Sequence, residues 1–301
     1  MASPALAPVP GDVTLFMGLG APKCGTTSLY ERMRAHPDCH LRAVKELHYF
    51  DSLASGTARG RGYIESVHRR LDRQRKRTYR PSRRLALRRD ARDHSDWLGA
   101  FDGTSRDDAA YLGYLCHGWR RQRVVGEITP DYAALGPDWL RAIRNLVPDV
   151  RAVLVLRDPV ARLLSHVRMA AGRLAPGQLD ETAIRMARET LDGQHRWIAR
   201  FSDYRRIVTQ ITSVFPQNRL HLEFFERLFT RDALSRIGAF LGIAPLDARP
   251  RAALHQGIPV AFPPDLLDAC RGYLEPQYDF AREYFGDRLP ESWRADVRAT
   301  S

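Results

Sequence analysis

The 301-residue chain contains very little lysine. Of its 47 basic residues only three are lysines, at positions 23, 45 and 76, and arginine supplies the rest. A planar guanidinium and a compact ammonium are not equivalent at a tight binding site. Two of the three lysines lie in the stretches with the densest functional signals, residues 22–28 and 45–51. We infer a local chemical need for lysine at these two places.

Cysteine and long apolar runs are also scarce. The four cysteines, at positions 24, 39, 116 and 270, show neither a CxxC pair nor the spacing of metal ligands. This pattern argues against a disulfide scaffold, fits a reducing compartment and predicts no bound metal. No apolar run approaches the roughly 20 residues that span a membrane. Residues 1–11 lack the basic and hydrophobic regions of a signal peptide, so we expect a cytoplasmic protein without a transmembrane segment.

The net charge of +12 comes almost entirely from one segment. Residues 59–92 contain fourteen Arg and Lys against three acids, an excess of eleven, so the rest of the chain is nearly neutral. The segment is predicted to form two helices broken at Pro81, as a solvated basic insertion. The alternative is a rim that attracts a polyanionic acceptor or a membrane surface. Because the excess charge is confined to this insertion, we expect no nucleic-acid partner.

The strongest single motif is a strand, a loop and a helix near the N-terminus. An apolar run ends in a glycine-containing loop and continues through Thr-Thr-Ser into an amphipathic helix over 27–35. This arrangement forms an anion site at a helix N-terminus. Gly20 and Gly25 have the spacing of a Walker A motif, but Thr26 stands where that motif requires lysine. The only lysine is Lys23, inside the loop. The loop therefore predicts a phosphate site unlike that of a Mg-nucleotide, with a plain βα turn as the structural alternative.

Three further segments are predicted as buried strands of a parallel sheet, at 123–128, 150–156 and 219–225. Such sheets bind ligands at the carboxyl ends of their strands. With helices between the strands, the fold class is α/β. We expect one domain over 1–301, a P-loop-NTPase-like three-layer sandwich with a central parallel sheet flanked by helices.

Arg157 and Ser165 form a second candidate anion site. Arg157 follows the 150–156 strand, and Ser165 lies eight residues later, on roughly the same side of the next helix. A guanidinium and a hydroxyl at this position predict a second phosphate site within the segment 150–172. The alternative is that Arg157 pairs structurally with an acid such as Asp158.

The segment 40–51 combines Lys45, Glu46, His48 and Asp51 with aromatic residues. This mixture suits neither a core nor a solvated surface, but it is typical of a pocket wall. Two structural alternatives remain open. Glu46 could form an ion pair with Lys45 or an arginine, and His48 could be a semi-buried histidine held by a hydrogen bond.

Together these motifs resemble the sulfotransferases that use 3′-phosphoadenosine 5′-phosphosulfate (PAPS). Residues 22–28 (Pro-Lys-Cys-Gly-Thr-Thr-Ser) resemble their 5′-phosphosulfate loop, and residues 154–165 resemble their 3′-phosphate segment. Residues 45–51 (Lys-Glu-Leu-His-Tyr-Phe-Asp) are similar to the base segment of the heparan-sulfate-type branch. Residues 127–132 (Glu-Ile-Thr-Pro-Asp-Tyr) are similar to a further segment in which that branch often has lysine where Ile128 stands. The similar segments cover most of the chain and follow one another in the same order as in that family.

The resemblance implies sulfuryl transfer and assigns roles to named residues. Glu46 would be the base, Lys23 would stabilise the leaving phosphate, and His48 would complete the catalytic group. Lys45, His48, Asp51 and Thr129 would face the acceptor. The donor PAPS, and its product 3′,5′-ADP (PAP), would be held by Lys23, Cys24, Gly25, Thr26, Thr27, Ser28, Arg157 and Ser165. The 12–51 region would thus carry both the phosphosulfate loop and the base.

The acceptor class is left open by the sequence. A hydroxyl or amine on a small molecule, glycan, lipid or natural product would fit, and the oligomeric state is undetermined. Two other functions compete. A P-loop-like nucleotide or small-molecule kinase would require Mg-ATP, and the loop lacks the motif lysine for it. A non-catalytic binder of anions or nucleic acid would act through residues 59–92.

Overall fold

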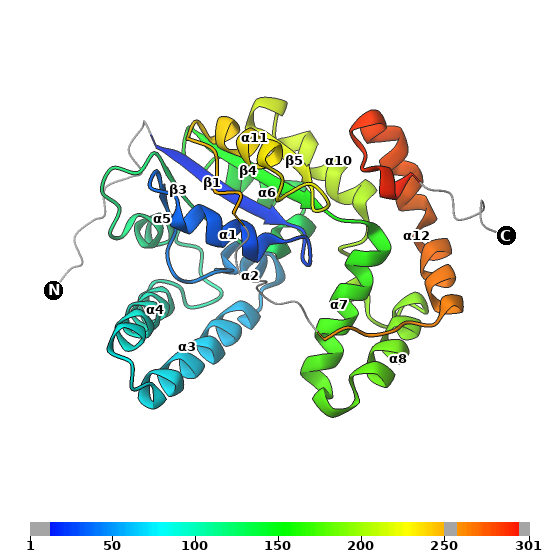
Figure 1. The fold of residues 1–301 in the computed structure, drawn as a ribbon. Helices are drawn as coiled ribbons and strands as arrows, with labels where there is room; N and C mark the ends of the chain where they lie inside the picture. Colours follow the sequence, from blue (N-terminus) through cyan, green and yellow to red (C-terminus); the bar gives the residue numbers. More distant parts are fainter. Residues whose placement is uncertain (1–12, 250–257, 295–301) are drawn as a thin grey trace.

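The computed structural model describes residues 13–249 and 258–294. Its centre is a five-stranded sheet in which every strand pair is parallel, in the order β2-β3-β1-β4-β5 (Figure 1). The strands are β1 (Thr14–Gly20), β2 (Cys39–His40), β3 (Val124–Ile128), β4 (Val150–Leu156) and β5 (Leu220–Phe224). The predicted α/β class with a central parallel sheet flanked by helices is confirmed.

The two central strands are almost entirely buried. All seven residues of β1 and six of the seven residues of β4 are buried. A parallel sheet covered on both faces requires such near-continuous apolar strands. The carboxyl ends of β1, β3 and β4 consequently meet at one edge of the sheet, where the polar segments that follow them come together.

Helices cover both faces of the sheet (Figure 1). Helices α1 and α5 pack near β3, α6 packs against β4, and α11 packs against β5. The helices are α1 (Thr26–Ala35), α2 (Tyr49–Ser55), α3 (Arg59–Arg77), α4 (Pro81–Ala100), α5 (Asp108–Cys116), α6 (Pro137–Arg144), α7 (Pro159–Leu174), α8 (Leu179–Leu191), α9 (Arg196–Ala199), α10 (Tyr204–Val214), α11 (Arg231–Leu241) and α12 (Pro264–Phe285).

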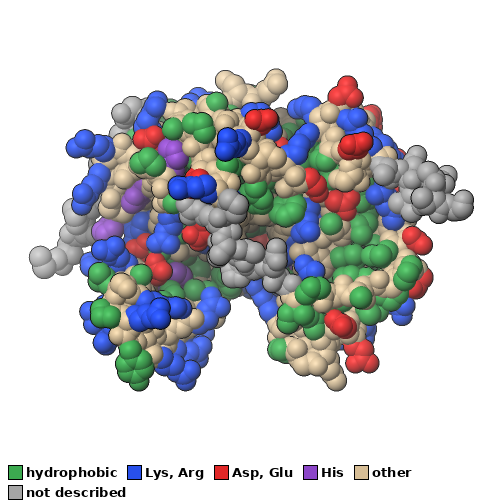
Figure 2. Space-filling view, in the orientation of Figure 1, with side chains coloured by type: hydrophobic (Ala, Val, Ile, Leu, Met, Phe, Trp, Pro, Cys, Tyr) green, Lys and Arg blue, Asp and Glu red, His purple; other side chains and the backbone are tan. Residues whose placement is uncertain are grey.

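Two helical pairs extend away from the sheet. The basic segment forms the antiparallel pair α3–α4, broken before Pro81 as predicted, and α7 packs against α8 on the other side. The space-filling view shows the molecule hollowed between these two pairs, with Lys and Arg side chains on the α3–α4 side (Figure 2).

The segment 40–51, predicted to form a pocket wall, contains the start of α2 at Tyr49. Pro276 favours an interruption of the last helix, and this prediction is wrong, because α12 continues through that residue. No helix in the described ranges combines the length and apolarity of a membrane-spanning segment. Arg251, His255 and Gly257 fall outside the described residues.

Candidate active site

The loop between β1 and α1 turns sharply at Gly25. This residue is the N-cap of α1 and has a φ of 80°, a conformation that favours glycine. A Cβ added to Gly25 would lie 2.9 Å from Cδ2 of Phe225, so the loop also packs closely on the segment after β5. No side chain caps α1, so its first amides remain available to an anion.

Lys23 lies in this loop with its ammonium directed at α7. Its backbone has a φ of 71°, and Nζ lies 3.4 Å from Sδ of Met169. Burial and the nearby charges of Arg173, Arg168 and Arg157 together lower the pKa of Lys23 to about 8, although Glu46 opposes the shift. Among the residues that the structure describes, no carboxylate forms an ion pair with Lys23. A bound anion would supply the missing negative charge.

The other predicted loop residues occupy different environments. Burial raises the pKa of the Cys24 thiol to about 12, so this cysteine is a packing residue and not a thiolate. Thr26 is buried in the first turn of α1, and Thr27 is partly exposed. The Ser28 hydroxyl accepts a hydrogen bond from Arg32 Nη1 at 3.0 Å.

Arg157 is fixed at the end of β4. Its Nη1 donates to the backbone carbonyl of Lys23 at 3.2 Å, and its guanidinium lies over the Phe225 ring, 4.5 Å from the centroid. The Tyr204 hydroxyl donates to the Arg157 carbonyl at 2.6 Å. Within residues 13–249 and 258–294, Arg157 forms no ion pair with an acid, and the Asp158 side chain instead caps α7 through the Ala161 amide at 2.8 Å. A hydrogen bond from Arg157 to the Lys23 loop therefore connects the two candidate anion sites.

The first two turns of α7 bury polar groups beside these sites. Ser165 is 8% exposed, and Arg162 is fully buried. Arg162 donates to Ser202 Oγ at 2.6 Å and contacts His166 Nδ1 at 3.3 Å, but its Nε has no partner among the described residues. Burial and then Arg162 lower the pKa of His166 to about 3, so this imidazole is neutral at physiological pH.

The predicted base segment faces the Lys23 loop. The Glu46 amide donates to the Ile128 carbonyl at 3.1 Å, which holds residues 45–48 beside β3. The Glu46 carboxylate forms a short ion pair with Lys45, as one structural alternative predicted. Burial opposes its ionisation, but Lys45, His48 and Arg173 outweigh burial and lower the pKa of Glu46. The carboxylate is therefore ionised at neutral pH.

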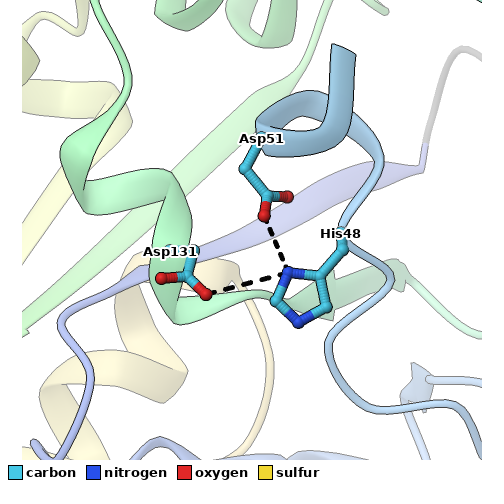
Figure 3. A group of neighbouring side chains, drawn as sticks. All are labelled: His48, Asp51 and Asp131. Atoms are coloured by element: carbon cyan, nitrogen blue, oxygen red, sulfur yellow. Dashed lines mark hydrogen bonds and ion pairs between the residues drawn. The ribbon is translucent and has the colours of Figure 1, made fainter. Parts of the chain in front are cut away.

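His48, Asp51 and Asp131 form a cluster next to Glu46 (Figure 3). His48 Nδ1 lies 2.8 Å from Asp51 Oδ2 and 3.7 Å from Asp131 Oδ2, and Nε2 lies 3.9 Å from Glu46 Oε2. Burial alone would favour the neutral ring, but Asp51, Asp131 and Glu46 raise the pKa of His48 to about 9. Burial raises the pKa of Asp131 to about 6. The cluster thus holds a proton at neutral pH.

The same three side chains are of the types that bind divalent metals. A metal would have to displace the proton that this cluster holds, since a metal ligand must be neutral imidazole. His48 Nδ1 is moreover already bonded to Asp51. The arrangement therefore favours an ion-paired imidazolium over a metal centre.

Buried hydrogen bonds of Thr129 and Glu127 support the His48 cluster. Thr129 is fully buried, and its hydroxyl donates to Glu127 Oε2 at 2.6 Å and lies 3.4 Å from the His48 amide nitrogen. Glu127 also accepts from the hydroxyls of Tyr111 at 3.0 Å and Tyr132 at 2.8 Å. Thr129 was predicted to contact the acceptor. Because its side chain is buried, any influence of Thr129 on the acceptor would be exerted through His48.

Sequence reasoning assigned no role to several residues that line this site. On α7, Arg162, His166, Met169 and Arg173 follow one another at three- or four-residue spacing, which places them on one face of the helix. The sequence spacing alone could have identified this face of α7. The structure shows that one of its residues, Met169, contacts Lys23. The approach of Tyr63 on α3, whose ring meets the His48 ring edge-on at 5.7 Å, had no local sequence signal.

Known proteins resemble this chain at the level of family and fold. Human carbohydrate sulfotransferase 15 is 28% identical over 157 residues, which are 50% of this chain and 26% of the human protein. The rat carbohydrate sulfotransferase 15 is 46% identical over 44 residues, 15% of this chain and 8% of that protein. The matched regions are thus about a quarter or less of these relatives.

A crystal structure of a sulfotransferase from Alicyclobacillus acidocaldarius superposes with a TM-score of 0.61 at 21% identity, and covers 94% of this chain and 99% of that one. This similarity confirms the fold. The model of the sulfotransferase family matches residues 16–247, well over half of the sequence. The match includes the Lys23 loop, the Glu46 segment and Arg157, and the chain belongs to the sulfotransferase family.

Proposed function

We propose that this protein transfers a sulfuryl group from PAPS to an acceptor hydroxyl or amine and releases PAP. The observation that carries the proposal is the contact between Arg157 and the Lys23 carbonyl. It holds the Arg157 guanidinium against the backbone of the loop that carries Lys23, at the ends of two adjacent strands, and the nearby Glu46 is ionised. Two linked anion sites facing a carboxylate suit a donor with two separated phosphates and a transferable sulfuryl group.

The Lys23 loop would hold the 5′-phosphosulfate. The uncapped amides at the start of α1 and the hydroxyls of Thr26, Thr27 and Ser28 can bind phosphate oxygens. Lys23 would donate to the bridging oxygen, where negative charge develops as the bond to sulfur breaks. Its partly buried ammonium, which has no carboxylate partner in the described ranges, is matched to a polyanion.

Arg157 and Ser165 would hold the 3′-phosphate. The Arg157 guanidinium is already oriented by the Phe225 ring and the Lys23 carbonyl, so little rotamer entropy would be lost on binding. The neighbouring Arg162 is buried without a carboxylate partner among the described residues, and its Nε makes no hydrogen bond there. This excess of positive charge supports a donor that bears a 3′-phosphate.

Glu46 would accept the proton of the attacking hydroxyl or amine. Its carboxylate is ionised and held by Lys45, and His48 Nε2 lies 3.9 Å from its other oxygen. Proton transfer to a positioned base contributes about 10²–10⁴-fold to a rate. His48, Asp51 and Lys45 would orient Glu46 and line the acceptor side.

Thermal unfolding in the presence of PAP, ADP and Mg-ATP tests the proposal. PAP at a hundredfold excess over its Kd should stabilise the protein by about 2.7 kcal/mol. Lys23→Ala should abolish this stabilisation. A shift with Mg-ATP and none with PAP would favour a kinase. A shift with PAP that survives Lys23→Ala would refute the assigned donor site.

A further inference from the structure

The free end of the α3–α4 pair carries most of the net positive charge of the chain. Residues 69–89 contain eleven Arg and Lys and a single acid, Asp72, which pairs with Arg75 at 3.1 Å. Arg69 lies 3.9 Å from Glu65, and in the described part of the chain the other basic side chains of this stretch form no ion pair. All of them except Arg75 are exposed. This excess of positive charge is therefore available to a partner.

Apolar side chains project from the same end of the pair. Tyr79, in the connection between α3 and α4, is 98% exposed, and Leu85 near the start of α4 is 52% exposed. The space-filling view shows hydrophobic side chains among the Lys and Arg side chains at this end (Figure 2). Tyrosine rings and basic side chains are together typical of a lipid–water interface, where the ring lies at the level of the headgroups and the cations meet anionic lipids.

The α7–α8 pair ends in a similar way. Leu174, the last residue of α7, is 70% exposed and follows the exposed Arg173. Figure 1 shows the free ends of both pairs on the same side of the molecule, away from the sheet. A flat surface can therefore contact both ends at once, with the hollow between them facing that surface (Figure 2).

The free ends are separate from the candidate active site, but they belong to helices that contact it. Tyr63 on α3 meets His48, and Met169 on α7 contacts Lys23. Beyond Tyr63, α3 continues to Arg77, a distance of about 20 Å at the rise of an α-helix. Donor and acceptor bound at the site would therefore leave the tip of the α3–α4 pair uncovered.

We propose that the free ends of the α3–α4 and α7–α8 pairs dock this protein on an anionic lipid membrane. The basic side chains of residues 69–89 would meet the headgroup phosphates, and Tyr79, Leu85 and Leu174 would enter the interface. A nucleic acid or a sulfated glycan would satisfy the charge but would leave these projecting apolar side chains in water. The inference goes beyond the proposed function, because docking requires no sulfuryl transfer.

Sedimentation of the full chain with lipid vesicles tests the docking. The vesicles are phosphatidylcholine alone, or phosphatidylcholine with about 30% phosphatidylglycerol as the anionic lipid. The protein should bind the anionic vesicles at least about tenfold more tightly, and this affinity should fall as the salt concentration rises. Lys76→Gln/Arg77→Gln/Arg80→Gln should lower it by about tenfold or more, because each cation adds to the attraction. Tyr79→Ser should also lower it, because less apolar surface enters the interface.

The control is Arg120→Gln/Arg121→Gln/Arg144→Gln, which removes three exposed arginines from the segments that precede β3 and β4. This variant should keep the wild-type affinity for anionic vesicles. Equal affinity for the two kinds of vesicle, or an affinity that survives either tip variant, would overturn the docking. Binding to heparin without binding to anionic vesicles would also overturn it, in favour of a polyanionic chain. Thermal unfolding shows that each variant is folded, and PAP binding tests the proposed function separately.

Discussion

Arg157 donates from Nη1 to the backbone carbonyl of Lys23 at 3.2 Å, and so joins the end of β4 to the loop after β1. The Phe225 ring lies beneath the guanidinium, and the Tyr204 hydroxyl holds the Arg157 carbonyl. Both the side chain and the backbone of Arg157 are therefore fixed before any ligand binds. Pre-organised cations of this kind bind anions with a smaller loss of entropy.

Gly25→Ala should disrupt the anion loop. The added methyl group would meet Phe225 at 2.9 Å and Leu228 at 3.1 Å, at a residue whose φ is 80°. Strain of this kind costs about 1–3 kcal/mol, and the shift of Phe225 would also release Arg157. We expect a lower free energy of unfolding and weakened PAP binding, measured by chemical denaturation and by titration.

Gly62→Ala is the matched control for that variant. Gly62 lies inside α3, and a Cβ there would meet nothing within 4 Å. Alanine is favoured over glycine within a helix by roughly 0.5–1 kcal/mol. This variant should be slightly more stable than the wild type and bind PAP equally well. A loss of PAP binding in both variants would show that the loop geometry is not the cause.

The affinity for PAP should fall as the pH rises through about 8. Burial and the neighbouring arginines lower the pKa of Lys23 to about 8, so the free protein loses this positive charge above that pH. The protonated ammonium is the form that binds phosphate, which fixes the sign of the effect. Calorimetric titrations at pH 6.5, 8 and 9.5 would measure it. Lys23→Gln should bind weakly at all three values, and a pH dependence unchanged in this variant would exclude Lys23 as its source.

Glu46→Gln should abolish sulfuryl transfer while PAP binding is retained. The amide is nearly isosteric with the carboxylate but cannot accept the acceptor's proton at neutral pH. The turnover rate should fall by about 10²-fold or more. Glu65→Gln, on α3, removes a carboxylate paired with Arg61 and should leave turnover unchanged. Turnover at the wild-type rate in Glu46→Gln would remove Glu46 as the base.

Glu127→Ala should destabilise the fold more than Glu127→Gln. The alanine variant leaves the hydroxyls of Thr129, Tyr132 and Tyr111 without their buried acceptor. Leaving a buried hydroxyl without its acceptor costs about 1–3 kcal/mol. Glutamine keeps a carbonyl oxygen and should retain part of this stability. Chemical denaturation would compare the two, and equal losses would show that the hydrogen bonds contribute little.

The sign of the pH effect at Glu127 follows from its burial. Burial raises the pKa of this carboxyl more than its three hydrogen bonds lower it. The folded protein therefore binds the proton more tightly than the unfolded chain does. Stability should be greatest below the unfolded pKa and decrease as the pH rises through the higher folded pKa. Glu127→Gln should flatten this part of the stability profile.

Local sequence signals predicted much of the sheet edge. The strand after residue 14, the Lys23 loop, the strand ending at Leu156 and the break before Pro81 all depend on short-range patterns of apolar residues, glycine and proline. The partners of the catalytic candidates could not be predicted in this way. Tyr63 approaches His48, and Phe225 supports Arg157, through contacts between segments distant in the chain. Only the fold brings these side chains together.

The helix α2 and the extent of α12 show two other limits. The segment before α2 is extended and irregular, and Glu46 and His48 both have positive φ values, of 66° and 53°. Such backbone conformations are rare outside glycine and leave no periodic pattern. In α12, the neighbouring helices α7, α8 and α10 pack against the helix and outweigh the local effect of Pro276.

Calorimetric titration of PAP and of 5′-AMP tests the central claim, that two linked anion sites hold a donor with phosphates at both the 3′ and 5′ positions. The wild-type protein should bind PAP at least about tenfold more tightly than 5′-AMP. Arg157→Gln should lower the PAP affinity to that of 5′-AMP. The control is Arg185→Gln, which removes an exposed arginine that pairs with Glu189 on α8 and should leave the PAP affinity unchanged. Equal affinities of the wild-type protein for the two nucleotides would contradict the account.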